Sequence, residues 1–279
     1  DILVPQSGQL RQRPRSGTNA RSSYSALRGK RVLVVDDNAL NREVAGDFLG
    51  LIGVEVETAN DGVEALALLN TKDFDVVLMD VHMPRMDGLS AAREIRLQQR
   101  WASLPIIALT ALARVEDQKE SRAAGMNAHL TKPIEHDALY QTLVDALNLS
   151  NTNWENKHNI RGVIENDGGL DLVLALRRFG NNEDRLQRML ESYLKDSTNA
   201  PHLFSAHLKL GDEQAAAALA HKLKGSSSYF GAKRFCEVAQ AVEQAAYEKR
   251  SVAQFEEEFL RELTLILDQG QAALEGLKK

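Results

Sequence analysis

The sequence predicts a chain with two folded regions, the first α/β and the second all-α. In residues 30–147, short apolar runs alternate with helical patterns, which is typical of a doubly wound parallel sheet covered by helices on both faces. In residues 166–278, only the helical period recurs and the breaks are short, which favours a four-helix bundle. Acidic and polar residues follow several predicted strands, and in parallel sheets ligands bind at these strand ends.

The first region is predicted to consist of five strand–helix units. Two runs, 32–35 and 76–79, are continuously apolar, as expected of strands that are buried on both faces. The expected strands are 31–36, 54–58, 75–80, 105–109 and 128–130. The helices expected after them are 40–51, 62–69, 89–98, 114–124 and 135–147.

The second region is predicted to form four long helices after a short one. Glycines punctuate it at Gly180, Gly211 and Gly231, and glycine is a common residue just beyond the end of a helix. The expected helices are 170–179, 183–210, 213–230, 232–248 and 252–277.

The composition is that of an ordinary globular protein of about two domains. The chain has 279 residues, of which 43% are hydrophobic and 26% are charged. It contains no run of about 18 apolar residues, and its first residues lack the pattern of a signal peptide. The single cysteine, Cys236, excludes an intrachain disulfide framework and a site with several cysteine ligands. We therefore expect a reducing, cytoplasmic setting.

Charge is distributed unevenly along the chain. Residues 1–31 carry a net charge of +6, so the other 248 residues carry −11 of the total of −5. An acidic folded part does not resemble a nucleic-acid-binding surface. Residues 1–28 are expected to be a basic flexible linker, although an RNA or lipid patch has a similar composition. Residues 149–165 are expected to be a second linker, between domains at 29–148 and 166–279.

Five polar residues fall at the carboxyl ends of the predicted strands. Asp36 and Asp37 end the first strand and Asp80 ends the third, while Thr110 follows the fourth and Lys132 the fifth. Because these ends meet at one edge of a parallel sheet, three carboxylates, one hydroxyl and one ammonium group should converge. The alternative is that the first two acids cap the following helix and that the lysine is a solvated charge.

Such a set of groups suits phosphoryl transfer assisted by a hard cation. Neighbouring carboxylates repel one another unless a cation joins them, and a site of few oxygen ligands favours Mg²⁺. The cation and the ammonium group can neutralise the oxygens of a phosphoryl group, and the hydroxyl can donate a hydrogen bond to them. One carboxylate can then act as a nucleophile and form an aspartyl phosphate.

Four strings in this region resemble the response-regulator receiver domain, which has a flavodoxin-like (βα)5 fold. They are Val-Val-Asp-Asp-Asn at 34–38, Met-Asp-Val-His-Met-Pro-Arg-Met-Asp-Gly at 79–88, Ala-Leu-Thr-Ala at 108–111 and Thr-Lys-Pro-Ile at 131–134. The match covers about residues 30–147, in the order and spacing of the family.

The resemblance assigns roles to the residues at the sheet edge. It implies that Asp80 accepts the phosphoryl group and that Thr110 and Lys132 contact its oxygens. It also implies Mg²⁺ as a cofactor. The implied ligands are Asp36 (mainly through water), Asp37, Asp80 and the backbone carbonyl of His82.

One position departs from the family pattern. Three residues before the lysine, the family often has an aromatic side chain that moves inward when the threonine binds phosphate. This chain has His129 there, and an imidazole offers a smaller packing gain and a charge that varies with pH. The resemblance therefore does not carry the aromatic switch to this chain. Ala111 is small enough to admit a phosphodonor, and Lys132-Pro133 resembles a pair that the family often joins by a cis peptide bond.

His221 is the candidate functional residue of the helical region. The apolar face of its helix consists of Ala216, Leu219, Ala220, Leu223 and Phe230. At about 100° per residue, His221 lies roughly 140° from that face and should point to solvent. Gly225 follows one turn later, where bare backbone would let a docking partner reach the ring, and a glycine there costs about 1 kcal/mol relative to alanine. Imidazole can carry a phosphoryl group, and Lys224 can hold the phosphate charge.

The string Ala-His-Lys-Leu-Lys-Gly-Ser-Ser-Ser-Tyr-Phe-Gly-Ala at 220–232 resembles the histidine phosphotransfer (HPt) domain. The resemblance covers about residues 166–278 and implies that His221 is the phosphorylated residue. Gln240 falls where that family can place a polar side chain near the imidazole. An exposed helical histidine is otherwise usually only a polar surface residue.

A receiver followed by an HPt domain resembles the C-terminal part of a bacterial hybrid sensor histidine kinase. This implies a phosphorelay, in which phosphate passes from a kinase histidine outside this chain to Asp80, then to His221, and then to an aspartate of a separate response regulator. The parent protein would be anchored in the inner membrane. The chain has no Gly-rich ATP lid, so it is expected to be the phosphotransferase part without the kinase core.

Three other readings stay open at this point. One is a receiver fold that has lost phosphorylation, and another is a binding module whose two domains dock partners without phosphate. The third is a hydrolase that uses Asp80 as a nucleophile, although His82 stands where such an enzyme would need a second carboxylate. The sequence also does not decide between transfer within one chain and transfer between chains.

Overall fold

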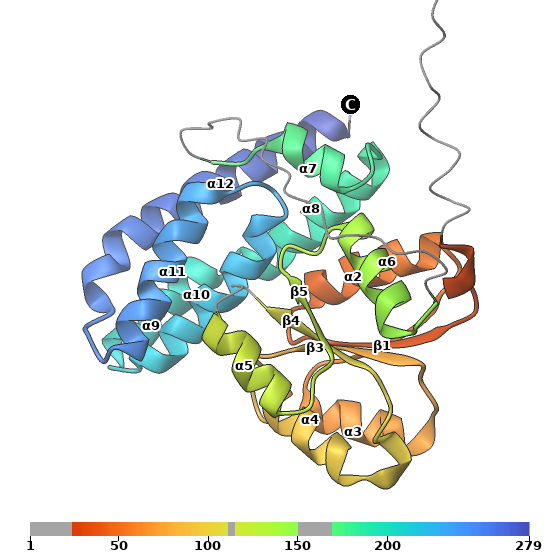
Figure 1. Cartoon of the computed structure of the whole chain (residues 1–279). Helices are drawn as coiled ribbons and strands as arrows, with labels where there is room; N and C mark the ends of the chain where they lie inside the picture. The colour runs from red at the N-terminus through yellow and green to blue at the C-terminus, as the bar shows by residue number, and fades with distance from the viewer. Residues whose placement is uncertain (1–23, 111–114, 150–168, 279) are drawn as a thin grey trace, which may run out of the picture.

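The computed structural model describes residues 24–110, 115–149 and 169–278. Its first half contains a five-stranded parallel sheet with the strand order β2-β1-β3-β4-β5 (Figure 1). The strands are β1 (Arg31–Val35), β2 (Glu55–Ala59), β3 (Val76–Asp80), β4 (Ile106–Thr110) and β5 (Ala128–Thr131). β3 and β4 are buried along their whole length, in agreement with their apolar sequences. The predicted doubly wound α/β class is confirmed for this half.

Helices cover both faces of the sheet (Figure 1). Helices α2 (Ala39–Leu51) and α6 (His136–Ala146) pack on one face, and α3 (Gly62–Thr71), α4 (Gly88–Leu97) and α5 (Val115–Ala123) lie on the other. Successive strand residues serve the two faces in turn: Val34 belongs to the first core and Val35 to the second. The helices therefore close both faces, and the carboxyl edge of the sheet is left for polar groups.

Side-chain caps place the helix starts close to this edge. Asn38 accepts a hydrogen bond from the backbone N–H of Leu40 at 3.0 Å and is the N-cap of α2. Asp61 and Asp87 cap α3 and α4 in the same way. The alternative in which Asp36 and Asp37 serve as the cap of α2 is therefore wrong.

The second half is entirely helical within the described residues. Its helices are α7 (Leu172–Arg178), α8 (Glu183–Ser197), α9 (Ala200–Lys209), α10 (Glu213–Ser228), α11 (Lys233–Tyr247) and α12 (Glu256–Leu277). Contacts join α8 and α9 to α12, α9 to α10, α10 to α11, and α11 to α12, so these helices form a bundle (Figure 1). Phe204 and Phe259 stack inside it with ring centroids 3.9 Å apart. Even α12, with 22 residues, lacks the hydrophobicity needed to cross a membrane, and the same holds for every other helix in the described part.

The prediction of one helix over 183–210 is wrong. The structure has α8 ending at Ser197 and α9 beginning at Ala200. Pro201 lies in the first turn of α9, where a missing N–H leaves no hydrogen bond unmade. In the middle of a continuous helix, the same proline would remove a hydrogen bond and clash with the preceding turn. The chain breaks the helix instead and starts a new one.

The two halves pack directly against each other. One continuous apolar core includes Phe48 of α2, Leu143 of α6 and Tyr193 of α8, and α2 contacts both α8 and α10. A short 3₁₀ helix, η1 (Ser25–Leu27), lies inside the stretch predicted as the first linker, yet Leu27 is buried in this core. Most residues of both predicted linkers lie outside the described part of the chain, and the predicted domain boundaries stay predictions.

We expect Gly88→Ala to destabilise the protein by about 1–3 kcal/mol, because a Cβ at this position would overlap the backbone carbonyl oxygen of Asp80. Gly46→Ala is the matched control. A Cβ at Gly46, within α2, meets nothing within 4 Å, and alanine favours a helix by up to about 1 kcal/mol. Urea unfolding of the two variants measures both effects. Equal stability of Gly88→Ala and the wild type would contradict the close approach of α4 to β3.

Candidate functional site

Three carboxylates converge at the carboxyl edge of the sheet. Asp36 follows β1 directly, Asp37 comes next, and Asp80 ends β3. One carboxylate oxygen from each lies within 4.8 Å of the others, and no other group of this kind occurs among the described residues. Asp36 and Asp80 are almost completely buried, and Asp37 is half-buried. The strand order predicted this convergence, since β1 and β3 are hydrogen-bonded neighbours.

Lys132 joins the cluster from the end of β5. Its Nζ lies 2.7 Å from Asp36 Oδ2 and 2.7 Å from Asp80 Oδ2, and only 5% of its side chain is exposed. The peptide bond between Lys132 and Pro133 is cis. Asn41 also holds Asp36: its Nδ2 donates to the two carboxylate oxygens at 3.0 and 3.1 Å. Lys132 is therefore a buried ion-pair partner, and its alternative reading as a solvated charge is wrong.

The electrostatics of the cluster favour an added cation. Burial, together with the charge of Asp80, raises the pKa of Asp36 to about 6 although Lys132 opposes the shift. Burial and the same neighbour raise the pKa of Asp37. Burial alone would lower the pKa of Lys132, but the two carboxylates it contacts raise it. One lysine thus does not fully compensate the carboxylates, and oxygen ligands of this kind suit a hard divalent cation.

Thr110 and His82 complete the predicted set at this edge. Thr110 ends β4, is 6% exposed, and its backbone carbonyl accepts a hydrogen bond from Lys132 N at 2.7 Å. The backbone N–H of His82 points to Asp80 Oδ1 at 3.4 Å. The structure therefore brings Asp36, Asp37, Asp80 and Lys132 together, and the backbone of Thr110 and of His82 lies next to them. Ala111 lies outside the described residues.

A second polar cluster surrounds His221 on α10. Its Nδ1 lies 3.0 Å from Glu243 Oε2 of α11, and Lys224 Nζ lies 2.7 Å from the other oxygen of the same carboxylate. Burial alone would raise the pKa of Glu243, but the hydrogen bond and charge of His221, followed by Lys224, hold it below its usual value. The carboxylate therefore fixes the imidazole and leaves Nε2 as the ring nitrogen without this contact.

Glu243 is a site residue that the sequence analysis missed. The family resemblance implied a polar side chain at Gln240, but the hydrogen bond to the imidazole is made three residues later, almost one turn along α11. The sequence did contain a signal for Glu243, because positions 240 and 243 are three residues apart and lie on the same face of a helix. Only the packing of α11 against α10 decides which of the two side chains reaches His221.

The prediction that His221 points to solvent is also wrong. Only 21% of its side chain is exposed, because the first half of the chain covers this part of α10. The rings of His82 and His221 lie 5.2 Å apart at an angle of 53°. Next to them, Asn38 Nδ2 donates to the backbone carbonyl of Lys222 at 3.1 Å. The acidic edge of the sheet and the histidine of the bundle therefore face each other.

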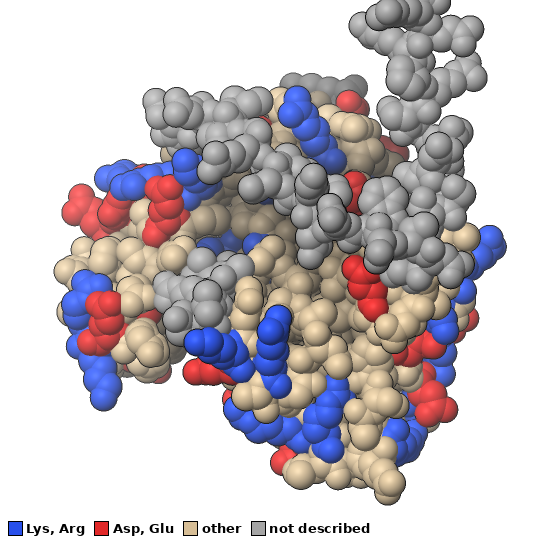
Figure 2. Space-filling view, in the orientation of Figure 1, with Lys and Arg blue, Asp and Glu red and all other residues tan. Residues whose placement is uncertain are grey.

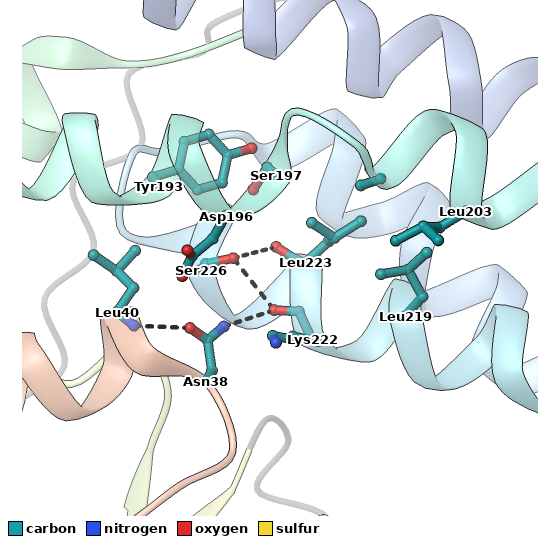
Figure 3. A pocket seen from close by; sticks show the side chains of 11 residues that line it. Asn38, Leu40, Tyr193, Asp196, Ser197, Leu203, Leu219, Lys222, Leu223 and Ser226 are labelled. Carbon is teal, nitrogen blue, oxygen red and sulfur yellow. Dashed lines mark hydrogen bonds between the residues drawn. The ribbon is translucent and has the colours of Figure 1, made fainter. Parts of the chain in front are cut away.

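A cavity of about 110 Å³ lies beside this contact. Figure 3 shows Asn38 and Leu40 of the sheet half facing Lys222 and Ser226 of α10, with the hydrogen bond from Asn38 to Lys222 between them. Leucine side chains and Tyr193 form much of its wall. Polar groups of the two halves thus meet next to His221, and the apolar wall of the cavity comes mostly from the bundle.

Charges of both signs mix over the molecular face in Figure 2, and no large single-sign patch covers it. The same view shows a hollow between the two halves, with Lys or Arg atoms at its back.

His129, at the position of the family's aromatic switch, contacts α5. Its Nε2 lies 2.5 Å from the hydroxyl oxygen of Ser121, and burial followed by the charge of Arg122 lowers its pKa. The imidazole is therefore tied to α5 rather than to the acidic cluster.

Each half of the chain matches a known family. Residues 32–144 match the family model of the response regulator receiver domain, and residues 185–273 match that of the Hpt domain.

The curated relatives are sensor kinases much longer than this chain. Sensor histidine kinase RcsC of Salmonella typhi is 45% identical over 112 residues, which cover 40% of this chain and 12% of that protein. Signal transduction histidine-protein kinase BarA of Escherichia coli (strain K12) is 31% identical over 216 residues, which cover 76% of this chain and 23% of that protein. The chain therefore spans 12% to 23% of the length of these two relatives.

Two solved structures are similar to part of this chain. Chemotaxis protein CheY4 of Vibrio cholerae is 38% identical, with a TM-score of 0.42, and the match covers 43% of this chain and 99% of that one. The receiver domain of sensor histidine kinase PA1611 from Pseudomonas aeruginosa is 38% identical, with a TM-score of 0.41, and the match covers 43% of this chain and 98% of that one.

We expect Glu243→Gln to lower the free energy of unfolding at pH 7 by about 1.5–3 kcal/mol, because it removes a charge-assisted hydrogen bond and leaves Lys224 without its ion pair. Since the folded pKa of Glu243 lies below its usual value near 4.5, this contribution is complete above that value and is lost as the pH falls through the folded pKa. Urea unfolding at pH 7 and at about pH 3.5 should show the difference between variant and wild type shrink. The exposed Glu237→Gln is the control, and an equal effect in both variants would contradict the role of Glu243.

Proposed function

Since the chain belongs to the receiver and Hpt families of two-component phosphorelay proteins, we propose that it passes a phosphoryl group from Asp80 to His221. The observation that carries this proposal is the juxtaposition of the two clusters. The ring of His82, two residues after Asp80, lies 5.2 Å from the ring of His221. His221 also interacts electrostatically with Asp37 of the acidic cluster.

In this proposal, the acidic cluster holds Mg²⁺. The donors are all oxygen atoms, and the raised pKa of Asp36 is consistent with a cation that relieves repulsion between the acids. Asp36, Asp37, Asp80 and the backbone carbonyl of His82 would hold the ion. When bound, it neutralises charge on the oxygens of the phosphoryl group.

The first step is attack of an Asp80 carboxylate oxygen on the phosphorus of a phosphohistidine in a kinase. A P–O bond to Asp80 forms while the P–N bond to the kinase breaks, and the kinase imidazole is the leaving group. Lys132 Nζ, 2.7 Å from Asp80 Oδ2, would hold one phosphoryl oxygen, and the hydroxyl of Thr110 would donate to another. Both groups stabilise the negative charge on the phosphoryl oxygens during the transfer.

The second step moves the phosphoryl group to the bundle. His221 Nε2 attacks the phosphorus, the new P–N bond forms, and the P–O bond to Asp80 breaks to return its carboxylate. Glu243 accepts a hydrogen bond from Nδ1–H, which keeps the proton on that nitrogen and the lone pair on Nε2. Lys224 balances the charge of Glu243 and would also offset part of the charge of the phosphate.

The proposed partners lie on both sides of this relay. A histidine kinase core outside this chain supplies the phosphoryl group, and an aspartate of a separate response regulator receives it from His221. The activity of this chain is then that of a phosphotransferase. The similarity to RcsC and BarA supports a hybrid sensor kinase as the parent protein. We place that parent in the bacterial inner membrane, with this part on the cytoplasmic side.

We expect a small-molecule phosphodonor with Mg²⁺ to place base-labile phosphate on Asp80 and acid-labile phosphate on His221. Asp80→Ala should abolish both labels, because the histidine receives its phosphate from the aspartate. His221→Ala should retain only the base-labile label. Mass mapping after brief acid or base treatment distinguishes the two sites.

The exposed His202→Ala is the matched control and should label like the wild type. Absence of label at both sites in the presence of Mg²⁺ would overturn the relay and leave a binding module. Continuous release of phosphate from a generic phosphoester would instead indicate a hydrolase.

We expect Asp37→Asn to weaken Mg²⁺ binding at least about tenfold, because it removes one of three anionic ligands from the cluster. Isothermal titration of the apoprotein with Mg²⁺ measures the change. Asp73→Asn is the control, since Asp73 is an exposed partner of Arg100 and has no place in the cluster. Equal affinity of Asp37→Asn and the wild type would exclude Asp37 as a ligand.

A further inference from the structure

The contact between the two halves has a charged border at helix α2. Asp47 lies on this helix, and its Oδ2 lies 3.0 Å from a guanidinium nitrogen of Arg188 and 3.3 Å from Nε of Arg185, both on α8. The Asp47 and Arg185 side chains are 29% and 11% exposed, so water screens the contact only in part. One carboxylate of the sheet half therefore meets two guanidinium groups of the bundle.

A second charged and polar border lies at the start of α6. Glu135, the N-cap of α6, lies 3.9 Å from Nε of Arg178 in α7. Nearby, the buried backbone N–H of Ile134 donates to the hydroxyl oxygen of Tyr229 at 3.1 Å. Here too the acid belongs to the sheet half and the arginine to the helical half, so the charges of the two surfaces are complementary.

Between the two borders, the phosphotransfer residues approach each other. The hydrogen bond from Asn38 to the backbone of Lys222 fixes the start of α2 next to His221. A Cβ on Gly225 would lie 3.6 Å from Asn41 Nδ2, which also binds Asp36. The bare backbone at Gly225 was expected to admit a docking partner. The residue that approaches it is Asn41, next to the acidic site of the same chain.

We propose that the receiver and Hpt surfaces of one chain are cognate docking partners, that Asp80 passes its phosphoryl group to His221 in cis, and that Asp47 with Arg185 and Arg188 selects this pairing. The inference rests on the proposed function and adds the partner. The transfer is that described above: the P–O bond to Asp80 breaks, the P–N bond to His221 Nε2 forms, and the carboxylate returns.

Two physical arguments favour the same chain as the partner. Joining two binding surfaces in one molecule gives effective concentrations on the order of mM, so even a weak contact is populated without a second molecule. The two arginines also discriminate between receivers, because a receiver without an acid at the position of Asp47 leaves them unpaired, and a basic residue there is repelled.

Complementation of two inactive chains tests transfer in cis. Asp80→Ala retains His221, and His221→Ala retains Asp80, so an equimolar mixture can phosphorylate a histidine only between chains. With acetyl phosphate and Mg²⁺, we expect the wild type to form phosphohistidine at a rate that dilution does not change. The mixture should be at least about tenfold slower and should slow further on dilution.

A charge exchange tests the selecting contact. Asp47→Arg should slow the appearance of phosphohistidine at least about tenfold, because it places three basic side chains together, while label on Asp80 is unchanged. Adding Arg188→Asp should recover at least about threefold of this loss through the reversed ion pair. Asp47→Asn removes the ion pairs without adding a positive charge, so its rate of phosphohistidine formation should lie between those of the wild type and Asp47→Arg.

The Asp73→Arg variant is the matched control, because Asp73 pairs with Arg100 within the sheet half and away from the bundle. Circular dichroism confirms the fold of each variant. A mixture as fast as the wild type would overturn transfer in cis, and a double variant no faster than Asp47→Arg would overturn the selecting role of the ion pair. In both results Asp80 still takes label, whereas loss of that label would overturn the proposed function itself.

Discussion

The ion pairs of Lys132 with Asp36 and Asp80 are the contacts on which the sheet edge depends. Two almost completely buried carboxylates with a third beside them repel one another, and water is largely excluded from the first two. Lys132 is 2.7 Å from both, and their charges raise its pKa, so it stays charged in its buried position. The strand order makes this possible, because β1 and β3 are adjacent and β5 ends at the same edge. The architecture thus concentrates negative charge that the hydrogen bonds of Asn41 and the charge of Lys132 stabilise.

Around His221 in the bundle the charge balance is reversed, with basic groups in excess of acidic ones. Here a single carboxylate, Glu243, stands between an imidazole and the ammonium group of Lys224. It orients the ring and compensates the lysine, and the ring of His82 from the sheet edge lies 5.2 Å from the ring of His221. Each cluster is therefore compensated only in part, and the excess of acid at the sheet edge faces the excess of base around His221. Burial and Asp80 raise the pKa of Asp37, while Lys222 and His221 of the bundle oppose the shift, so the two charge distributions interact.

Local sequence patterns predict the sheet, the order of its units and the acidic edge, because apolar runs and strand-end acids are local signals. They also predict the apolar face of α10, where Ala216, Ala220 and Leu223 are buried. They fail where another element decides. The orientation of His221 followed from the periodicity of its own helix, which says nothing about a second domain that covers the polar face. The hydrogen bond of Glu243 depends on how α10 and α11 pack. The break before α9 is different, since Pro201 is a local signal that the helical pattern outweighed.

Within the proposed relay, the docked arrangement has to be reversible, because a downstream regulator needs the same imidazole that the receiver covers. The charge balance of the transfer supplies a reason for release. Before transfer, the phosphoryl group lies on Asp80 and faces the imidazole that will attack it, which is uncharged when its Nε2 carries a lone pair. Afterwards the Asp80 carboxylate has returned, and a negatively charged phosphohistidine faces the acidic edge across a short distance. The ion pairs of Asp47 are partly exposed, with Arg188 60% exposed, so they oppose this repulsion only weakly and are screened by salt. Transfer itself therefore favours opening of the contact that made it possible.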